Sequence, residues 1–282
     1  MNQLTRDYMR TGFKRWVRWI VLAVIFAVAC GFLANWQWNR RTQVVKAITR
    51  LDRNYAHSLV PIDTIVRRVD GFSIRYEFRP VLLSGHYLSD KSLLLRNQIN
   101  NGNPGFDQLV PFQLDSGKVL TIDRGWLSTG NLHDLPDHIP AIVAGHVQIV
   151  GRLIHAQQPD SRQAPKGQAM AIRPQVLNQQ WHLPERNLYT AVFGQLVAES
   201  PKSKVLPVLA DKPELSEGNH LSYAFQWVLF AVLGFLTIAA NIRQDLREKR
   251  TEEDPSYVPP VRRKRLGDAD KEAEDALLDA AN

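Results

Sequence analysis

Asn219-His220-Leu221-Ser222-Tyr223-Ala224-Phe225-Gln226-Trp227 begins the stretch that decides the fold, an apolar run that continues to Ala240. No residue from Tyr223 to Ile242 carries a charge at neutral pH. About 20 such residues are what a helix needs to cross the hydrocarbon core of a bilayer. The sequence therefore predicts a transmembrane helix over residues 223–242.

A second apolar run near the start of the chain extends from Trp19 to Trp38. A basic segment followed by such a run is also typical of a signal peptide. However, no small residues of a cleavage site end the run, and Trp36 and Trp38 lie where the aromatic belt of a spanning helix is expected. We therefore predict an uncleaved transmembrane helix over residues 19–38, preceded by a basic segment over residues 1–18.

The lysine and arginine residues near the two spans set the expected orientation, because cytoplasmic loops are enriched in them. They are equally frequent on both sides of the first span, whereas eight follow the second span and three lie close before it. We expect a multi-pass protein of the cell (inner or plasma) membrane. Both termini would be cytoplasmic, and residues 56–222 would form the external, periplasmic-side domain.

The net charge of +7 does not indicate nucleic-acid binding, because the excess is concentrated beside the membrane. Residues 1–55 contain ten Lys and Arg against two Asp, whereas residues 56–222 contain 16 Lys and Arg against 15 Asp and Glu. Anionic lipid attracts basic residues next to a span. We therefore expect membrane lipids, and no nucleic acid, among the partners.

The hydrophobic pattern changes after the first span. Apolar residues recur at three- and four-residue spacing from Val44 to Leu51, which predicts a helical extension over residues 39–55. Short runs rich in β-branched and aromatic residues then alternate with turn residues such as Asp115-Ser116-Gly117, which is typical of strands joined by tight turns. The expected strands are residues 78–88, 92–98, 106–114, 118–126, 142–155, 189–198 and 204–209, with a short helix over residues 174–180.

About seven strands between residues 56 and 222 are enough for one core. The predicted fold is a mainly antiparallel β domain with short helices, closed or nearly closed into a barrel and flanked by two transmembrane helices. The Pro- and Gln-rich segment 157–168 is expected to be an exposed loop. Residues 243–282 contain 9 Lys and Arg, 11 Asp and Glu and three prolines, so we expect a disordered cytoplasmic tail there.

Candidate catalytic and metal-binding groups are few, and we expect no enzyme. Cys30 is the single cysteine and lies within the first span, which excludes a disulfide framework or a paired-cysteine copper site. It is interpreted as a small apolar residue that faces lipid or a helix. His133 and His138 flank two acids but fit no zinc-ligand spacing, so they are interpreted as part of an exposed loop. Asp123-Arg124-Gly125-Trp126 is interpreted as an ion pair at the end of a strand, followed by a glycine turn that redirects Trp126.

His220 differs from these candidates, because a neutral imidazole is a good axial ligand of haem iron. Tyr223, Phe225 and Trp227 follow it closely and would give a macrocycle apolar walls. From these residues alone, an interfacial histidine bonded to water or lipid headgroups is the preferred interpretation.

A series of motifs runs in order along the chain from about Trp36 to Ala240. They are Trp36-Gln37-Trp38-Asn39-Arg40, Arg79-Pro80-Val81, Gly85-His86-Tyr87, Leu95-Arg96-Asn97, Gly102-Asn103-Pro104-Gly105-Phe106, Val110-Pro111-Phe112, Asp123-Arg124-Gly125-Trp126-Leu127, Gly151-Arg152-Leu153 and Asn219-His220-Leu221-Ser222-Tyr223-Ala224 with Gln226-Trp227. This series resembles the surfeit-locus family of cytochrome c oxidase assembly factors, which has mitochondrial and bacterial members. The similarity is only loose between Gln157 and Glu199.

The resemblance implies a bacterial assembly factor that helps the catalytic subunit of the oxidase to mature, and it implies that His220 binds haem a. Haem a synthase and the catalytic subunit would be the partners between which the haem passes. The residues expected to surround a bound haem are Trp36, Trp38, Tyr223 and Trp227 around the ring and Arg40 or Arg41 at the propionates.

A cofactor-free scaffold is the alternative interpretation. Such a protein would dock on the oxidase or on a respiratory supercomplex, and Asn219 and His220 would only cap the second helix. A membrane-bound hydrolase is disfavoured, because the chain has no Gly-x-Ser-x-Gly elbow and no other nucleophile paired with a base.

Overall fold

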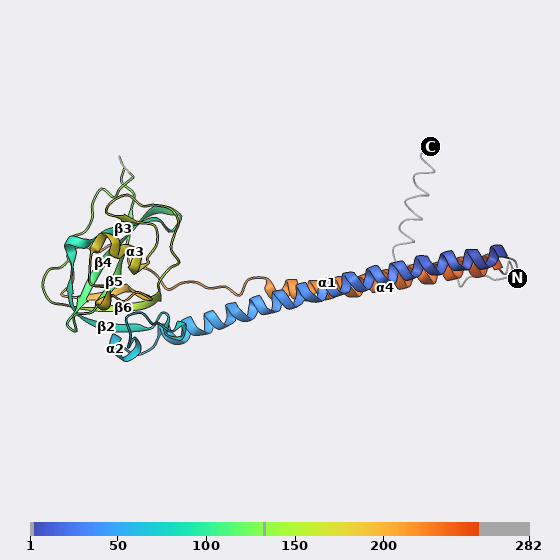
Figure 1. The fold of residues 1–282 in the computed structure, drawn as a ribbon, viewed down its shortest axis with the longest axis horizontal. Helices are drawn as coiled ribbons and strands as arrows, with labels where there is room; N and C mark the ends of the chain where they lie inside the picture. The colour runs from blue at the N-terminus through green and yellow to red at the C-terminus, as the bar shows by residue number, and fades with distance from the viewer. Residues whose placement is uncertain (1–2, 132–133, 254–282) are drawn as a thin grey trace, which may run out of the picture. The chain divides into compact units, whose positions relative to one another are not determined.

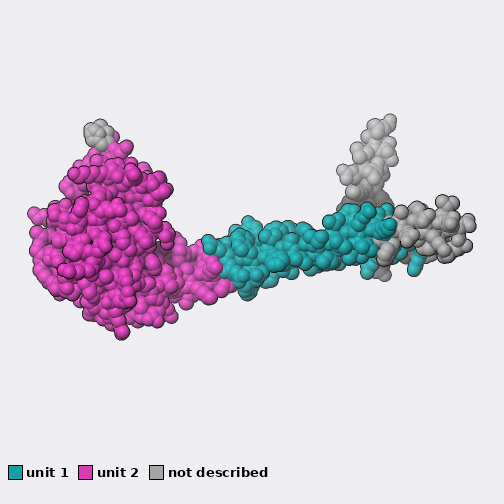
Figure 2. Space-filling view, in the orientation of Figure 1, with its two compact units in different colours: residues 1–41, 218–282 teal, residues 42–217 magenta. Residues whose placement is uncertain are grey.

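The computed structural model describes residues 3–131 and 134–253 of the 282-residue chain. Its contacts divide the chain into two units, which Figure 2 colours separately: residues 1–41 with 218–282, and residues 42–217. The described part of the first unit is helical, whereas the second unit is built on a β sheet (Figure 1).

Two long helices dominate the first unit: α1 (Gln3–Tyr55), which continues into the second unit from Thr42, and α4 (His220–Glu253). Each contains a segment long and apolar enough to cross a membrane, Lys14–Tyr55 in α1 and His220–Glu248 in α4. Only 11% and 0% of their apolar windows are buried, whereas the core helix of a soluble protein is mostly buried. The prediction of two apolar helices, one before and one after the β domain in the sequence, is confirmed.

Small residues line the contact between α1 and α4. Ala23 and Cys30 of α1 and Ala224 of α4 are buried, although most of their helical neighbours are exposed. The ring of Phe26 on α1 packs on Gly234 of α4, since a Cβ added to Gly234 would lie 3.4 Å from it. Small residues permit close packing between membrane helices. Cys30 therefore faces the neighbouring helix.

Helix α4 includes residues 243–253, for which the prediction of disorder is wrong. No proline interrupts the helix before Pro255, and Gln244 donates to Glu248 one turn later over 3.0 Å. Asp245 also accepts hydrogen bonds from Arg15 and from Nε1 of Trp16 on α1. Helix-forming residues and contacts with α1 thus maintain the helix beyond the apolar run. The rest of the predicted tail, residues 254–282, lies outside the described residues.

Within the described residues, the second unit contains one eight-stranded sheet with the order β1-β2-β6-β8-β5-β4-β3-β7. The strands are β1 (Val60–Pro61), β2 (Pro80–Tyr87), β3 (Leu93–Asn100), β4 (Asn103–Leu114), β5 (Val119–Ser128), β6 (Val147–His155), β7 (Gln168–Ala169) and β8 (Val192–Ser200). Strand β2 also pairs with β4, so the pairings β2-β6-β8-β5-β4 return to β2 in a circuit of five strands. The pairs are antiparallel except β1–β2, β3–β7 and β5–β8, so the prediction of a mainly antiparallel β domain is confirmed.

The apolar side chains of the circuit form the main core. Its fully buried members include Val81, Leu83, Phe112, Ile122 and Ile149. In the described part of this unit, five short helical segments accompany the sheet: α2 (Ile62–Ile65), α3 (Pro174–Trp181), and the 3₁₀ turns η1 (Ile74–Tyr76), η2 (Ser89–Lys91) and η3 (Glu185–Asn187). A second core lies under α3, where the buried Trp181 donates to the carbonyl of Lys91 over 2.7 Å.

Two segments differ from the predicted strand pattern. Strands β3 and β4 are joined by the two-residue turn Asn101-Gly102, where the sequence predicts a longer loop. Both residues have positive φ (48° and 80°), as in type I′ hairpin turns, which suit the twist of paired strands. Residues 204–209 do not form the predicted strand. Only Val208 bridges to Trp126, because Pro207 has no N–H to donate to a ladder.

Candidate functional site

His220 is the first residue of α4 and is half-buried. Its Nδ1 lies 2.9 Å from Oε1 of Gln37 on α1. Because this amide oxygen only accepts hydrogen bonds, the contact favours the tautomer in which Nδ1 carries the proton and donates it. Nε2 then carries the lone pair, and within the described residues it makes no hydrogen bond. A hydrogen bond to one ring nitrogen is how proteins orient the other nitrogen toward a metal.

Aromatic side chains follow His220 along α4. Tyr223 and Trp227 lie on its face of the helix, because residues three and seven positions apart are neighbours there. Tyr223 is exposed, and the half-buried Trp227 meets the ring of Phe230 edge-on, with centroids 5.8 Å apart. A Cβ added to Gly218 would lie 3.8 Å from Nε2 of His220. Because Gly218 has no side chain, residue 218 does not cover Nε2 of His220.

Gln37 lies between Trp36 and Trp38 on α1. Successive helical residues point about 100° apart, so the two tryptophans are directed to the flanks while Gln37 points at His220. Both tryptophans are more than half exposed (60% and 52%), and Arg40 is also exposed. The structure thus joins His220 to Gln37 and places the other predicted site residues around the same end of the helix pair.

Gln37 is the site residue that reasoning from the sequence missed. The sequence does contain a signal for it: Gln37 is an amide between two tryptophans at the end of the first apolar run, and His220 is a histidine at the start of the second run. When the two runs pack antiparallel as helices, these two residues come together.

The opposite end of the helix pair also carries polar contacts. Asp245 of α4 accepts hydrogen bonds from Arg15 and from Trp16 Nε1, the latter over 2.8 Å. These residues line a cavity of about 310 Å³ with Trp19 and Asn241. Polar contacts therefore fix α1 against α4 at both ends of the apolar segments.

The second unit contains a buried polar network around Arg124 of β5. This fully buried guanidinium lies 3.5 Å from Glu199 of β8 and donates to Gln108 over 2.8 Å and to Ser203 over 3.0 Å. Tyr87 donates its hydroxyl to Glu199 over 3.1 Å. Burial, followed by the charge of Glu199, raises the pKa of Tyr87, so this phenol stays neutral. The network ties β2, β4, β5 and β8 together.

The predicted ion pair between Asp123 and Arg124 is wrong. Adjacent residues of a strand point to opposite faces of the sheet. Arg124 therefore pairs with Glu199, whereas Asp123 accepts the N–H of Gly125 over 3.0 Å.

The chain also does not leave the sheet at Trp126, because β5 continues to Ser128. Gly125 has a φ of +124°, and a Cβ there would lie 2.4 Å from the carbonyl oxygen of Val208. The glycine instead allows Val208 to approach β5 and to accept the N–H of Trp126 over 2.8 Å.

Asp107 and Asp123 line a cavity of about 220 Å³ in the second unit. Burial raises the pKa of Asp107 to about 8, and the charge of Asp123 contributes to that rise. Burial also raises the pKa of Asp123 to about 6, against the opposing hydrogen bonds from Gly125 and Gln195. The pair therefore retains a proton near neutral pH. The described residues contain no group of three or more His, Cys, Asp or Glu side chains that would hold a metal ion.

The loop around His138 is exposed, as the sequence predicts. Asp137 organises it by accepting hydrogen bonds from the backbone and side-chain nitrogens of Asn131 (3.1 and 2.9 Å). His138 is exposed, and His133 lies outside the described residues.

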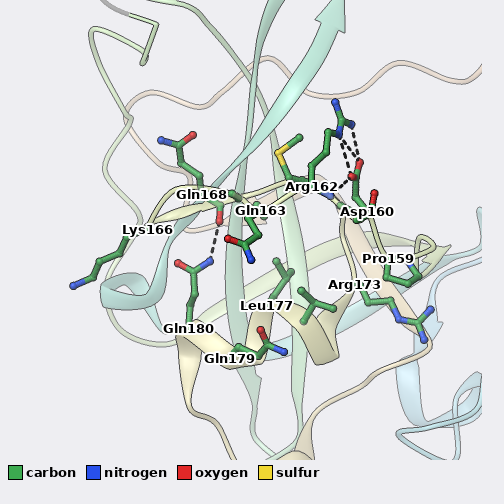
Figure 3. A pocket seen from close by; sticks show the side chains of 16 residues that line it. Pro159, Asp160, Arg162, Gln163, Lys166, Gln168, Arg173, Leu177, Gln179 and Gln180 are labelled. Carbon is green, nitrogen blue, oxygen red and sulfur yellow. Dashed lines mark hydrogen bonds and ion pairs between the residues drawn. The ribbon is translucent and has the colours of Figure 1, made fainter.

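A cavity of about 470 Å³ lies between the predicted loop 157–168 and α3 (Figure 3). Asp160 is the acid in its lining, and it pairs with Arg162 over 2.7 Å. Gln180 donates to the carbonyl of Gln168 over 2.8 Å, and Leu177 contributes apolar surface (Figure 3). The lining contains no histidine, cysteine or glutamate.

Comparison with known proteins supports the resemblance of the motifs. An uncharacterized SURF1-like protein of Mycobacterium tuberculosis is 26% identical over 253 residues, which cover 86% of this chain and 89% of that protein. The cytochrome oxidase assembly protein SHY1 of Saccharomyces cerevisiae is 28% identical over 126 residues, 41% of this chain and 32% of the yeast protein. A SURF1-like protein of Dictyostelium discoideum is 29% identical over 122 residues, covering 42% and 43% of the two chains.

A sequence model of the SURF1 family matches residues 24–232, which include most of the apolar segment of α1, the whole β sheet and the first part of the apolar segment of α4. The match extends through the segment 157–199, in which the motifs are only loosely similar. The chain belongs to the SURF1 family.

Proposed function

We propose that this chain is a membrane-bound assembly factor for cytochrome oxidase. Membership of the SURF1 family and similarity to a yeast protein named for oxidase assembly support this role. The two exposed apolar helices support attachment to the membrane in which the oxidase is assembled. In this proposal both termini are cytoplasmic and the β unit lies on the external side, in accordance with the excess of basic residues after α4.

The proposed substrate is haem a, which His220 would hold on its way from haem a synthase to the catalytic subunit of the oxidase. One observation carries this step: Nδ1 of His220 lies 2.9 Å from Oε1 of Gln37. When Nδ1–H donates to this oxygen, the lone pair of Nε2 is left for iron. The exposed rings of Trp36, Trp38 and Tyr223 and the half-buried Trp227 offer apolar surface beside the imidazole. The exposed Arg40 offers a charge for a propionate.

The roles of the residues follow from this geometry. Gln37 selects the tautomer of His220 and fixes the direction of its ring, so Nε2 is prepared for coordination. The aromatic side chains exclude water from the face that they cover. Because a single histidine nitrogen is the proposed ligand from this chain, release to a receiving histidine requires the exchange of one coordination bond.

A gene-replacement experiment tests the assembly role. Membranes of a strain that lacks this gene are examined for the haem a absorbance of the oxidase, with haem b as the internal reference. The deletion is expected to lower haem a selectively, and the wild-type gene is expected to restore it. An unchanged haem a content in the deletion strain would contradict the assembly role.

Expressing variants of this protein in the deletion strain distinguishes haem delivery from the cofactor-free alternative. His220→Ala is expected to fail, whereas His138→Ala, which alters an exposed histidine of the β unit, is expected to succeed. The alternative is a scaffold in which the start of α4 is only a cap, and the carbonyl of Asn219 does accept the N–H of Tyr223 over 3.0 Å. Full restoration by His220→Ala would favour that scaffold.

A further inference from the structure

The second unit contains a basic pocket where α1 ends against the η1 turn. Its volume is about 210 Å³, and it is lined by Arg53, Asn54, His57, Arg75, Tyr76 and Arg79. Three guanidinium groups thus share one small cavity without a carboxylate in its lining. No ion pair or hydrogen bond joins any of these three guanidiniums to another residue in the described ranges.

The nearest acids along the chain neutralise other cations. Asp52, beside Arg53, pairs with Lys212 over 2.6 Å. Glu77, which follows Tyr76, pairs with Arg50 over 3.3 Å. The positive charge of the pocket is therefore uncompensated by these carboxylates.

The backbone around the pocket is held in place before any ligand arrives. The buried amide of Asn54 donates to the carbonyls of Arg75 and Glu77, over 2.7 and 2.8 Å, and so ties η1 to the end of α1. Arg79 accepts the N–H of Leu153 in β6 over 3.1 Å, which anchors it to the sheet. Such preorganisation lowers the entropic cost of binding.

Tyr76 orients two of the guanidiniums. The Cζ atoms of Arg75 and Arg79 lie 4.5 and 5.9 Å from the centre of its ring. A planar guanidinium that stacks on an aromatic ring keeps its N–H donors in the plane, where an anion can accept them.

Ordinary structural roles explain this cluster only in part. The negative end of the α1 dipole stabilises one nearby cation such as Arg53, since it is equivalent to about half a charge. Arg75 is exposed and can be solvated. Nε of Arg79, however, is buried and has no hydrogen-bond acceptor among the described protein atoms. Nε of Arg50, Arg124 and Arg152 shows the same feature, so the cavity that the three guanidiniums share, rather than this atom, indicates a ligand.

We propose that this pocket binds a phosphate group. The forked donors of arginine match phosphate oxygens, and several guanidiniums around one multiply charged group are typical of phosphate sites. A carboxylate has one charge and two oxygens, so it would satisfy fewer of the three guanidiniums. The phosphate belongs either to a soluble phosphate compound or to a lipid headgroup. This site is separate from His220 and does not depend on haem binding.

Calorimetric titration of the full-length protein in a phosphate-free, non-ionic detergent solution tests the proposal. One arm uses inorganic pyrophosphate, and the other uses a soluble short-chain phosphatidylglycerol. Binding is expected in at least one arm and is expected to weaken about tenfold or more in Arg75→Gln and in Arg79→Gln. Arg162→Gln, which removes an exposed arginine of the same unit, is the matched control and should bind like the wild type.

The outcomes distinguish the sources of the phosphate. Arg75-dependent binding of pyrophosphate assigns a soluble ligand, and Arg75-dependent binding of the lipid alone assigns a headgroup. Arg75 is exposed, so Arg75→Gln keeps the test valid even where Arg79→Gln fails to fold. Absence of binding in both arms, or binding that survives Arg75→Gln unchanged, would overturn the proposal.

Discussion

The buried pair of Arg124 and Glu199 shows at the residue scale what holds the β unit together. Both side chains are inaccessible to solvent, and each is also hydrogen-bonded to neighbouring groups. Removing one partner of a buried pair leaves the other charge without compensation, which costs about 3–5 kcal/mol. We therefore expect Arg124→Met to lower the free energy of unfolding by about this amount, measured by unfolding of the full chain in detergent.

Arg162→Met is the control for this prediction. Arg162 also pairs with a carboxylate, Asp160, but its side chain is 65% exposed. Exposed pairs contribute little to stability. Equal effects of the two substitutions would contradict the assignment of Arg124 as a structural residue.

Asp107 gives the β unit a dependence on pH. An unfolded aspartate has a pKa of about 3.9, whereas burial raises the pKa of folded Asp107 to about 8. The folded state thus keeps a proton that the unfolded state releases. Stability should fall as the pH rises from about 4 to about 8, and it should level off above that.

Asp107→Asn removes this ionisation and keeps the shape of the side chain. The variant is expected to match the wild type near pH 4 and to exceed its free energy of unfolding by about 1–3 kcal/mol near pH 9. Asp160→Asn provides the comparison, because Arg162 lowers the pKa of Asp160 to about 2. The free energy of unfolding of Asp160→Asn should not exceed that of the wild type at high pH. A wild-type stability that is flat between these pH values would disprove the role of Asp107.

At the scale of elements, the close approach of Val208 to β5 depends on Gly125. Its φ of +124° is unfavourable for a residue with a side chain, and a Cβ would meet the carbonyl oxygen of Val208 at 2.4 Å. Gly125→Ala is therefore expected to lower the free energy of unfolding by about 2 kcal/mol or more, measured by thermal unfolding. Gly71→Ala should have little effect, because its nearest contact would be 3.9 Å away at an ordinary φ. If Gly125→Ala and Gly71→Ala both unfold at the same temperature as the wild type, the close approach of Val208 does not constrain β5.

The elements themselves were largely predictable from the sequence. Alternating apolar residues and turn residues predict β2 to β6, β8 and α3, because periodicity and turn chemistry are local properties. The two-residue strands β1 and β7 and the parallel contact of β5 with β8 carry no local signal. Residues 243–253 were mispredicted for a related reason, since their helix depends partly on contacts with α1.

The candidate site was predictable only in part. The sequence singles out His220 as a candidate because a histidine beside an apolar aromatic run is unusual. Gln37 was not, because its role requires a partner 183 positions away in the sequence. Likewise, the pairing of Arg124 with Glu199, rather than with Asp123, depends on which strands lie side by side.

At the scale of the whole molecule, the orientation in the membrane is a separate prediction. Ser161 lies in an exposed loop of the β unit, and Thr251 lies near the end of α4. In a Cys30→Ser background, Ser161→Cys is expected to react with a membrane-impermeant maleimide in spheroplasts, whereas Thr251→Cys should react only after lysis. The reverse pattern of labelling would place the β unit in the cytoplasm.

The most direct test of the central claim is the haem content of the purified protein. The wild type, His220→Ala and His138→Ala are expressed in a host that makes haem a, and the bound haem is measured by absorbance and extraction. The wild type and His138→Ala are expected to carry haem a, and His220→Ala is expected to lose most of it. Equal haem a in all three proteins, or none in the wild type, would contradict the proposal that Nε2 of His220 holds the haem.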